Sequence, residues 1–373
     1  MKTVDPMHLR SSVVTIDSAK LAKNWNLTKS LLPTTSRILP MVKANAYGHG
    51  DILIANVVSK LGAVGVGVAD LGEAVSLRDR SFKGEILCMG PLSGECVEFG
   101  IDQDVILNIR SLEELKIMQD LQSRTSRPFR FHIKIDSGMN RWGFRSNEWE
   151  KAANEINKLS CGIPEGIYTH LCESNNPDQT FTKEQIKRFS HAVTIFEKIL
   201  KKRLIRHCAN SGGILHHPES HFDWVRPGVA MYGYPTLNGK ELDYKPILKW
   251  KAQLFQVQQI EPGDTVGYNR TFRASRKMTL GVVGVGYGDG YQRGYASANI
   301  DYRGHHLKIV GIICMDALMV DLTNVPKPMV GEEVTLIGSE SDSPTAWDLA
   351  HLTQTIPYEV LTRIQSRVPR VLQ

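Results

Sequence analysis

The chain has 373 residues, of which 42% are hydrophobic and 23% charged, and its net charge is +6 at pH 7. This composition is that of an ordinary globular protein and excludes a disordered chain, a collagen and a coiled coil. No apolar run reaches the roughly 18 residues that a membrane helix needs, and the basic residues are too scattered for a nucleic-acid surface. The start of the chain carries charges and lacks the apolar stretch of a secretory signal. We therefore expect a cytoplasmic protein with neither a membrane nor a nucleic acid as partner.

The cysteines indicate reduced thiols and no metal site. They stand at positions 88, 96, 161, 172, 208 and 314, and no two of them form a C-x-x-C pair. Because these spacings fit no zinc framework, we expect free and mostly buried thiols.

The first two-thirds of the chain alternates β-branched runs with amphipathic stretches. The runs are Val13–Ile16, Val64–Val68, Val105–Leu107, Phe131–Ile135, Ile167–Thr169 and Ile205–Cys208. The amphipathic stretches are Ser18–Leu32, Ser111–Leu121, Asn147–Leu159 and Lys183–Lys202. Such alternation indicates a parallel sheet, and eight or nine repeats in about 230 residues favour a closed (β/α)₈ TIM-like barrel. Because a barrel takes eight strands, one early strand can belong elsewhere.

The pattern changes after Tyr244. Strand-like runs punctuated by Gly and Pro now follow one another directly, which predicts a mainly antiparallel β domain. These runs are Ala252–Ile260, Met278–Val285, His306–Ile313, Met319–Leu322 and Glu333–Ile337, with one helix at Ala346–Thr353. We predict an α/β barrel domain over residues 12–245 and a β domain over residues 246–373, the latter joined by residues 1–11.

A lysine ends an early apolar strand and enters a Gly-rich turn, in the segment Pro40–Gly50. The carboxyl ends of barrel strands line the active site. Desolvation there would lower the pKa of Lys43 and make its amine a nucleophile. Taken alone, a surface lysine that extends into water fits the same pattern.

Three further polar segments lie at predicted strand ends or loops. Arg141, in Asp136–Phe144, could clamp a carboxylate or a phenolate. Ser211, in Ala209–Gly213, and Arg226, in Arg226–Val229, could hold a phosphate together with backbone N–H groups. Short turns of this kind are also common without a ligand.

The β domain contributes loop tyrosines and an unusual carboxylate. Tyr268 lies in Gly267–Arg270, and Tyr287 lies in Gly286–Gly290. Asp316 stands within an apolar run, where a carboxylate needs partners.

Together these segments resemble one enzyme family. The segment Val42–Gly50 resembles the cofactor-lysine motif of the pyridoxal-phosphate-dependent alanine racemases, and the resemblance continues in order through both domains. Its further segments are Asp136–Phe144, Thr169–His170, Ala209–Ser211, Arg226–Gly233, Gly267–Tyr268, Gly286–Gly290, Cys314–Asp316 and Ile356–Tyr358.

The resemblance implies an isomerase that interconverts L-alanine and D-alanine and so supplies D-alanine for peptidoglycan. Pyridoxal 5′-phosphate would be bound to Lys43 as an aldimine, which makes the α-proton of the amino acid removable. Lys43 would serve the D-enantiomer, and Tyr268, on the opposite face of Cα, the L-enantiomer. Because the free pKa of both groups is about 10, each needs a shift toward the working pH.

The resemblance also implies the supporting residues. Arg226 would hydrogen-bond the pyridine nitrogen and leave it unprotonated, since arginine does not readily give up a proton. Arg141 would reach the cofactor phenolate and the substrate carboxylate, oriented by Lys134, which is often carbamylated in the family. His170 would link Tyr268 to Arg226. The phosphate would be held by Tyr47, Ser211, Tyr358 and the backbone of Gly228 and Val229.

A shared active site is implied as well. Tyr268 and Met315 would come from the other subunit of a head-to-tail homodimer, so that each site would be built from two chains. Tyr287 would narrow the substrate entrance, and Met315 would leave little space beyond a methyl group. Asp316 would support this region.

Three alternatives stay open beside alanine racemisation. A broader-specificity amino-acid racemase is typically exported, and no signal is evident. A fold-related decarboxylase with the same cofactor normally places an acidic residue at the ring nitrogen, which Arg226 argues against. A protein that only stores the cofactor would resemble the barrel alone, so the β domain argues against it.

Overall fold

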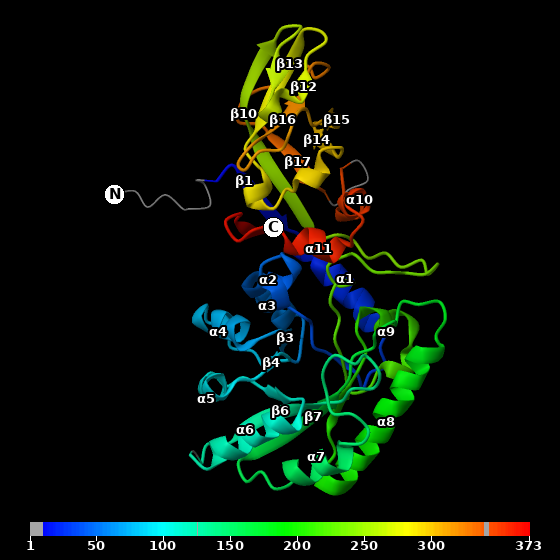
Figure 1. Cartoon of the computed structure of the whole chain (residues 1–373). Helices are drawn as coiled ribbons and strands as arrows, with labels where there is room; N and C mark the ends of the chain where they lie inside the picture. Colours follow the sequence, from blue (N-terminus) through cyan, green and yellow to red (C-terminus); the bar gives the residue numbers. More distant parts are fainter. Residues whose placement is uncertain (1–9, 125, 339–342) are drawn as a thin grey trace. The chain divides into compact units, whose positions relative to one another are not determined.

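The computed structural model describes residues 10–124, 126–338 and 343–373. The chain forms two compact units (Figure 1). Unit 1 comprises the chain up to residue 20, residues 47–53 and residues 245–373, and unit 2 comprises residues 21–46 and 54–244.

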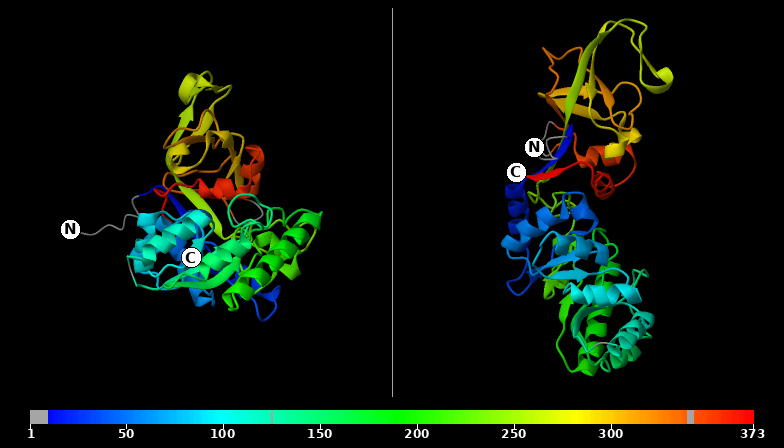
Figure 2. Two further views of the ribbon diagram at one scale, coloured as in Figure 1. Left: turned by 60° about the horizontal axis from the view of Figure 1, so that its bottom comes forward. Right: turned by 90° about the vertical axis from the view of Figure 1, so that its left-hand side faces the viewer.

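Unit 2 alternates strands and helices, and its helices α4 to α8 lie outside its strands (Figure 2). The strands are β2 (Arg37–Ile38), β3 (Val66–Val68), β4 (Ile86–Cys88), β5 (Leu107–Ile109), β6 (Phe129–Lys134), β7 (Gly162–Tyr168), β8 (Ile205–His207) and β9 (Trp224–Val225). The α-helices from residue 18 to residue 216 are α1 (Ser18–Ser30), α2 (Lys43–Tyr47), α3 (Asp51–Lys60), α4 (Leu71–Asp79), α5 (Gly94–Asp102), α6 (Leu112–Gln122), α7 (Trp149–Ile156), α8 (Thr180–Leu200) and α9 (Ser211–His216). A short 3₁₀ turn, η2 (Pro218–Ser220), precedes β9.

These strands close into a parallel barrel. β2 pairs with β9, β3 pairs with β4, and β5 to β8 form one continuous sheet, all in parallel register. The remaining junctions are the parallel bridges Met41–Gly67 and Leu87–Ile106 and the 2.8 Å backbone hydrogen bond from Arg226 to Ala209. The predicted (β/α)₈ architecture is confirmed.

Capping residues place helix starts directly after strand ends. The side chains of Asp70, Ser111 and Asn210 follow β3, β5 and β8, and each accepts a hydrogen bond from an amide in the first turn of the next helix. Because the caps satisfy these first-turn amides, the helix N-termini and the polar turns gather at the carboxyl end of the barrel, where barrel active sites lie.

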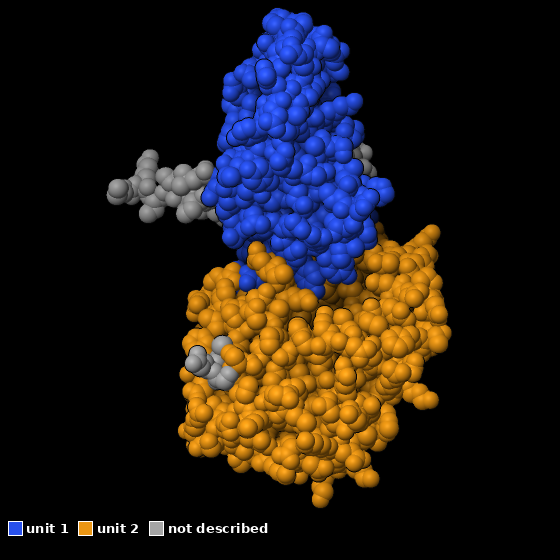
Figure 3. Space-filling model, in the orientation of Figure 1, with its two compact units in different colours: residues 1–20, 47–53, 245–373 blue, residues 21–46, 54–244 orange. Residues whose placement is uncertain are grey.

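Unit 1, coloured blue in Figure 3, is built on one mainly antiparallel sheet. Its strands are β1 (Ser12–Ile16), β10 (Leu248–Ile260), β13 (Met278–Val283), β14 (Asn299–Tyr302), β15 (His305–Lys308), β16 (Leu318–Asp321), β17 (Glu333–Ile337) and β18 (Arg370–Leu372). The path β15-β14-β17-β10-β1-β18 carries most of them, and β13 pairs with β10 and β16.

Short elements complete unit 1. They are the hairpin β11 (Thr265–Val266) and β12 (Phe272–Arg273), the 3₁₀ turns η3 (Tyr268–Arg270), η4 (Tyr287–Asp289) and η5 (Arg293–Tyr295), and the helices α10 (Ala346–Leu352) and α11 (Pro357–Thr362). The predicted mainly antiparallel β domain is confirmed. None of the described helices combines the length and the apolar character that crossing a bilayer requires.

The first strand does not belong to the barrel. The predicted barrel range began at residue 12, but β1 pairs antiparallel with Leu248–Ala252 of β10 and parallel with Arg370–Leu372 of β18. A run of β-branched residues predicts a strand but not its partner. The sequence pattern therefore could not assign β1 to its sheet.

Candidate active site

Lys43 begins α2, which is a turn of left-handed helix. The φ angles of residues 44 to 47 are 51°, 54°, 52° and 54°. This conformation costs roughly 1–2 kcal/mol for each residue other than glycine. Four such residues in succession persist only where tertiary contacts fix them, as is common at functional sites. The backbone that carries Lys43 into the site is therefore held under strain.

The surroundings of the Lys43 amine favour its neutral form. Burial lowers the pKa of Lys43, Arg141 and Arg226 lower it further, and Glu73 opposes them. A larger neutral fraction at moderate pH makes the amine both a nucleophile and a base.

Arg226 is fixed inside the barrel. Its guanidinium is buried, with Nη1 2.8 Å from Nδ1 of His207 and Nη2 2.7 Å from the carbonyl of Thr169. Nε2 of His207 in turn lies 2.8 Å from Nδ1 of His132. Burial lowers the pKa of Arg226 to about 10, so the side chain stays protonated at neutral pH. The arginine is thus a fixed cation.

Two further predicted residues lie in the same region of unit 2. Nζ of Lys134 stands 4.6 Å from the ring centroid of Tyr168, and burial holds the pKa of Lys134 well below its usual range. Burial, followed by the charge of Arg226, lowers the pKa of His170. Among the described residues, the His170 ring makes no hydrogen bond to Arg226, whose Nη1 partner is His207.

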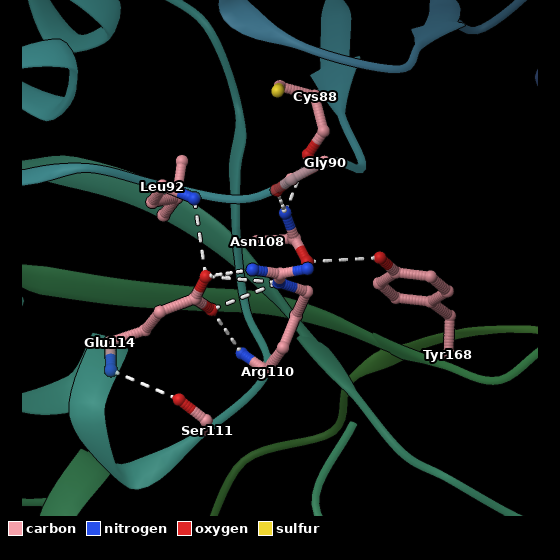
Figure 4. A network of polar contacts seen from close by, with 8 residues as sticks. All are labelled: Cys88, Gly90, Leu92, Asn108, Arg110, Ser111, Glu114 and Tyr168. Carbon is pink, nitrogen blue, oxygen red and sulfur yellow. Dashed lines mark hydrogen bonds and ion pairs between the residues drawn. The ribbon is translucent and has the colours of Figure 1, made fainter. Parts of the chain in front are cut away.

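Arg141 lies against a tryptophan. The guanidinium carbon of Arg141 stands 4.9 Å from the ring centroid of Trp142, and that of Arg110 stands at the same distance. Arg110 is paired with the buried carboxylate of Glu114 (Figure 4). Glu114 also accepts hydrogen bonds from the amides of Arg110 and Leu92 (2.8 and 3.2 Å). The Trp142 ring therefore contacts both the predicted substrate arginine and a firmly anchored one.

Ser211 meets the segment after β9. Its Oγ accepts hydrogen bonds from the amides of Gly228 (3.0 Å) and Ala230 (3.3 Å). Because the hydroxyl oxygen accepts both bonds, its own proton is left to donate. The structure thus brings Ser211, Gly228 and Val229, three of the predicted phosphate residues, into one turn region.

The other predicted residues lie in unit 1. The rings of Tyr47 and Tyr358 have centroids 5.9 Å apart. The segment of Tyr287 packs on that of Met315: the amide of Tyr287 donates to the carbonyl of Cys314 (3.0 Å), and the amide of Gly288 donates to that of Met315 (2.9 Å).

Three of these side chains are open to solvent in the single chain. Tyr268, Met315 and Tyr287 are 68%, 52% and 43% exposed. The phenol of Tyr268 makes no hydrogen bond within the described residues, and Asp316 pairs with Arg367 at 2.6 Å. In unit 2, Lys43, Lys134 and His170 therefore lie in the field of Arg141 and Arg226. In unit 1, Tyr268, Met315 and Tyr287 are exposed, whereas Tyr47 is buried.

Sequence patterns did not predict four residues of this region, His132, His207, Trp142 and Glu73. A signal existed for the first of these. Side chains alternate along a strand, so an inward Lys134 on β6 implies an inward His132 two residues earlier. His207 ends β8, where barrel strands present functional groups.

The fold and this chemistry define a class of protein. A closed parallel barrel that presents a lysine of lowered pKa after a strand end, continued by an antiparallel β unit, has the parts of an enzyme that binds a carbonyl cofactor on that lysine. Models of the alanine racemase N-terminal domain and C-terminal domain match residues 16–236 and 247–372. The chain belongs to the alanine racemase family.

Individual relatives match nearly the whole chain. Alanine racemase 1 of Clostridium acetobutylicum is 35% identical over 376 residues, covering 98% of this chain and 96% of that protein. The solved alanine racemase of Bacillus anthracis with bound L-Ala-P is 28% identical with a TM-score of 0.92, covering 98% of this chain and 95% of that one. The solved alanine racemase of Bartonella henselae with covalently bound pyridoxal phosphate is 28% identical with a TM-score of 0.85, covering 97% and 99%.

Proposed function

We propose that this chain interconverts L-alanine and D-alanine with pyridoxal 5′-phosphate held on Lys43. The observation that carries the proposal is the position of Lys43 after a barrel strand, where burial, Arg141 and Arg226 lower its pKa. The family supports the same reaction, since a relative named alanine racemase and both alanine racemase domain models match this chain along both units.

The residues present fit this cofactor. The cations Arg141 and Arg226 act on Lys43 and suit an anionic ligand, and the Ser211 hydroxyl has a proton to donate. Ser211 and the backbone of Gly228 and Val229, with Tyr47 and Tyr358, would hold the phosphate. When bound, the cofactor withdraws electrons from the α-carbon of the amino acid, so the α-proton becomes removable.

Two bases act on opposite faces of the α-carbon. Lys43 takes the proton from D-alanine or returns it, and Tyr268 does the same for L-alanine. The lowered pKa of the Lys43 amine suits a base near neutral pH.

Arg226 sets the electronic character of the site. It would donate a hydrogen bond to the pyridine nitrogen, and since a guanidinium can only donate, it leaves that nitrogen unprotonated. With a pKa of about 10, Arg226 keeps its charge throughout the working range. By leaving that nitrogen unprotonated, Arg226 would moderate the electron withdrawal that the cofactor supplies and so restrain side reactions.

Arg141 would bind the substrate carboxylate and the cofactor phenolate. Lys134 would orient it, and the low pKa of Lys134 supplies the neutral amine that carbamylation requires. His170 would lie between Arg226 and the Tyr268 that completes the same site.

The second base would come from another copy of the chain. Tyr268 and Met315 are exposed in the single chain, as expected for residues that complete a partner's site. We propose a homodimer with two shared sites, each lined by Tyr287, Met315 and Asp316 of the β unit. Two-fold symmetry makes both sites equivalent.

The cellular role follows from the product. We propose that the enzyme works in the cytoplasm and supplies D-alanine for peptidoglycan.

The test is incubation of purified protein and pyridoxal phosphate with L-alanine in D₂O, followed by separation of the enantiomers. We expect D-alanine that carries deuterium at the α-carbon. If the visible cofactor band is present and no D-alanine forms, the reaction is a different one.

Single variants assign the two bases. Lys43→Ala should abolish the visible band and the borohydride-reducible link, and a band retained in this variant would remove Lys43 from its role. Tyr268→Phe should keep the band but nearly stop α-proton exchange of L-alanine. Sedimentation completes the set, because a fully active monomer contradicts the shared site.

A further inference from the structure

Glu73 lies beside the turn that follows Lys43. It is the third residue of α4, and its amide donates to the cap Asp70 at 2.9 Å. Its Oε1 accepts a hydrogen bond from the amide of Ala44 at 2.6 Å, and its Oε2 accepts one from the amide of Ala69 at 2.7 Å. A single carboxylate thus joins the end of β3 to the residue directly after Lys43.

The turn needs such a support. Ala44 is the first of four left-handed residues that are not glycine. Within the turn, the amide of Ala46 returns to the carbonyl of Val42 at 2.7 Å. The bond from Ala44 to Glu73 fixes the first strained residue from outside the turn, at the point where the Lys43 side chain leaves the backbone.

A second glutamate, Glu114, occupies the equivalent position on another barrel helix. Glu114 is likewise the third residue of its helix, after the cap Ser111, and its carboxylate likewise accepts amides from its own turn and from the preceding loop (Figure 4). The carboxylate of Glu114, however, is bound by the guanidinium of Arg110. Both glutamates tie neighbouring barrel loops together, but the loop tied by Glu73 carries the lysine.

Glu73 also acts on Lys43 through its charge. The charged or titratable groups that interact electrostatically with this amine are Arg141, Arg226, His170 and Glu73. Arg141 and Arg226 disfavour the ammonium, and Glu73 favours it. The carboxylate therefore combines a fixed position with a charge opposite to that of the two arginines.

We propose that Glu73 is a positioning residue of the reaction: its carboxylate holds the Ala44 amide and so aims the Lys43 amine. The inference rests on the proposed function, in which Lys43 carries the cofactor and acts as a base. Both oxygens of Glu73 accept from backbone amides, so Glu73 works through the backbone and the charge beside Lys43.

The test compares Glu73→Gln with the matched variant Glu114→Gln in the full-length protein. Gln keeps the size of the side chain, but it removes the charge and one of the two acceptors. In protein freed of cofactor, trace acetylation of Lys43, followed by mass spectrometry across a pH series, reports the protonation of its amine. With the negative charge gone, the midpoint for Lys43 should move to lower pH in Glu73→Gln and stay at its wild-type value in Glu114→Gln.

The loaded enzyme gives the second readout. Misplacement of the amine should lower kcat by about tenfold in Glu73→Gln, while the KM for alanine changes by less than about threefold. If this variant is too unstable to purify, the double variant Ala44→Gly/Glu73→Gln replaces it, since glycine adopts the left-handed conformation without steric cost. The double variant should recover folding but keep the shifted midpoint.

The outcomes separate the two proposals. An unchanged midpoint in Glu73→Gln, or an equal shift in Glu114→Gln, overturns the role of Glu73 and leaves it a structural residue in the first turn of α4. Failure of the proposed function appears elsewhere, as borohydride fixing the cofactor on a residue other than Lys43 in the wild-type protein.

Discussion

Arg226 donates a hydrogen bond from Nη1 to Nδ1 of His207 over 2.8 Å. Because a guanidinium has no acceptor, Nδ1 of His207 must be unprotonated, and its proton lies on Nε2. Nε2 then donates to Nδ1 of His132, 2.8 Å away. One fixed cation thus sets the tautomers of two buried histidines, and these histidines hold the cation in place.

Loss of His207 should destabilise the barrel through Arg226. In His207→Phe the guanidinium keeps its charge but loses a buried acceptor, which costs about 1–3 kcal/mol of the free energy of unfolding. Denaturant unfolding of the loaded enzyme measures this loss. His207→Gln is the control, since its amide oxygen can still accept from Arg226 and its loss should be smaller. Equal losses in the two variants would show that the acceptor contributes nothing.

The same histidines predict a pH dependence of stability. Burial and then the charge of Arg226 lower the pKa of His132 to about 3, and they hold that of His207 well below its usual range. The unfolded chain titrates these groups at about 6.5, so it binds more protons as the pH falls below that value. Their contribution is therefore complete above about pH 7 and is lost in acid, with a slope of up to about 1.4 kcal/mol per pH unit for each histidine.

Removing one of these two histidines should make the free energy of unfolding less dependent on pH. Between about pH 6 and pH 4, the free energy of unfolding of His132→Phe should fall less steeply than that of the wild type, by about the slope of one histidine. His306→Phe, a change at an exposed position, should keep the wild-type slope. Parallel pH profiles for all three proteins would refute the assignment.

Ala44→Gly should raise stability. Ala44 has a φ of 51°, and relief of left-handed strain, less the added freedom of the unfolded chain, leaves a gain of about 1 kcal/mol. Ala22→Gly, in the right-handed helix α1, should instead lose about 1 kcal/mol. Thermal unfolding of both variants decides the matter, and a loss in Ala44→Gly would mean that the turn is not strained.

Sequence patterns predicted much of the fold and less of the site. The β17 segment Glu333–Ile337 and the helices α6 and α8 follow from local periodicity. The partner of β1 did not, because it depends on residues more than 200 positions away. The spacing of Lys43 suggested a strand end, but for Arg226 and Ser211 the residues alone left a structural role open, and the family resemblance supplied their proposed roles.

The features of the site that local sequence patterns do not predict depend on tertiary contacts. Nothing about Lys43–Tyr47 marks a left-handed turn, since alanine favours right-handed helix. Its first left-handed residue, Ala44, is hydrogen-bonded to Glu73, which lies on another helix. The contact between Trp142 and Arg110 likewise arises from the packing of two barrel loops.

Trp142 should affect substrate binding through Arg141. A cation over an exposed aromatic ring is worth about 0.5–1 kcal/mol, so Trp142→Ala should raise the KM for alanine by about two- to fivefold and change kcat little. Trp142→Phe keeps an aromatic face and should lie near the wild type. Steady-state kinetics in both directions tests this, and a fall in kcat alone would place Trp142 in another role.

Arg367 joins the two loops that would line the proposed substrate entrance. Its Nε lies 2.7 Å from Oδ1 of Asp289, and its Nη2 lies 2.6 Å from Oδ1 of Asp316. Asp289 follows Tyr287 by two residues, and Asp316 follows Met315 directly. These hydrogen bonds raise the pKa of Arg367, so the bridge keeps its charge at every working pH.

Breaking this bridge should widen the accepted substrates. In Arg367→Met the two aspartates lose their shared partner, although Asp289 still accepts a hydrogen bond from the amide of Gly286 at 3.0 Å. The entrance loops, then joined only through their backbone, should loosen enough to admit a larger side chain. Pocket discrimination of one methylene-sized group is worth about 1–3 kcal/mol, so losing part of it should raise kcat/KM for serine relative to alanine by about three- to tenfold. Arg363→Met is the matched control, because Arg363 pairs only with Glu359 on its own helix among the described residues. The ratio should stay constant in the control, and an equal change in both variants would mean that the bridge has no part in selecting alanine.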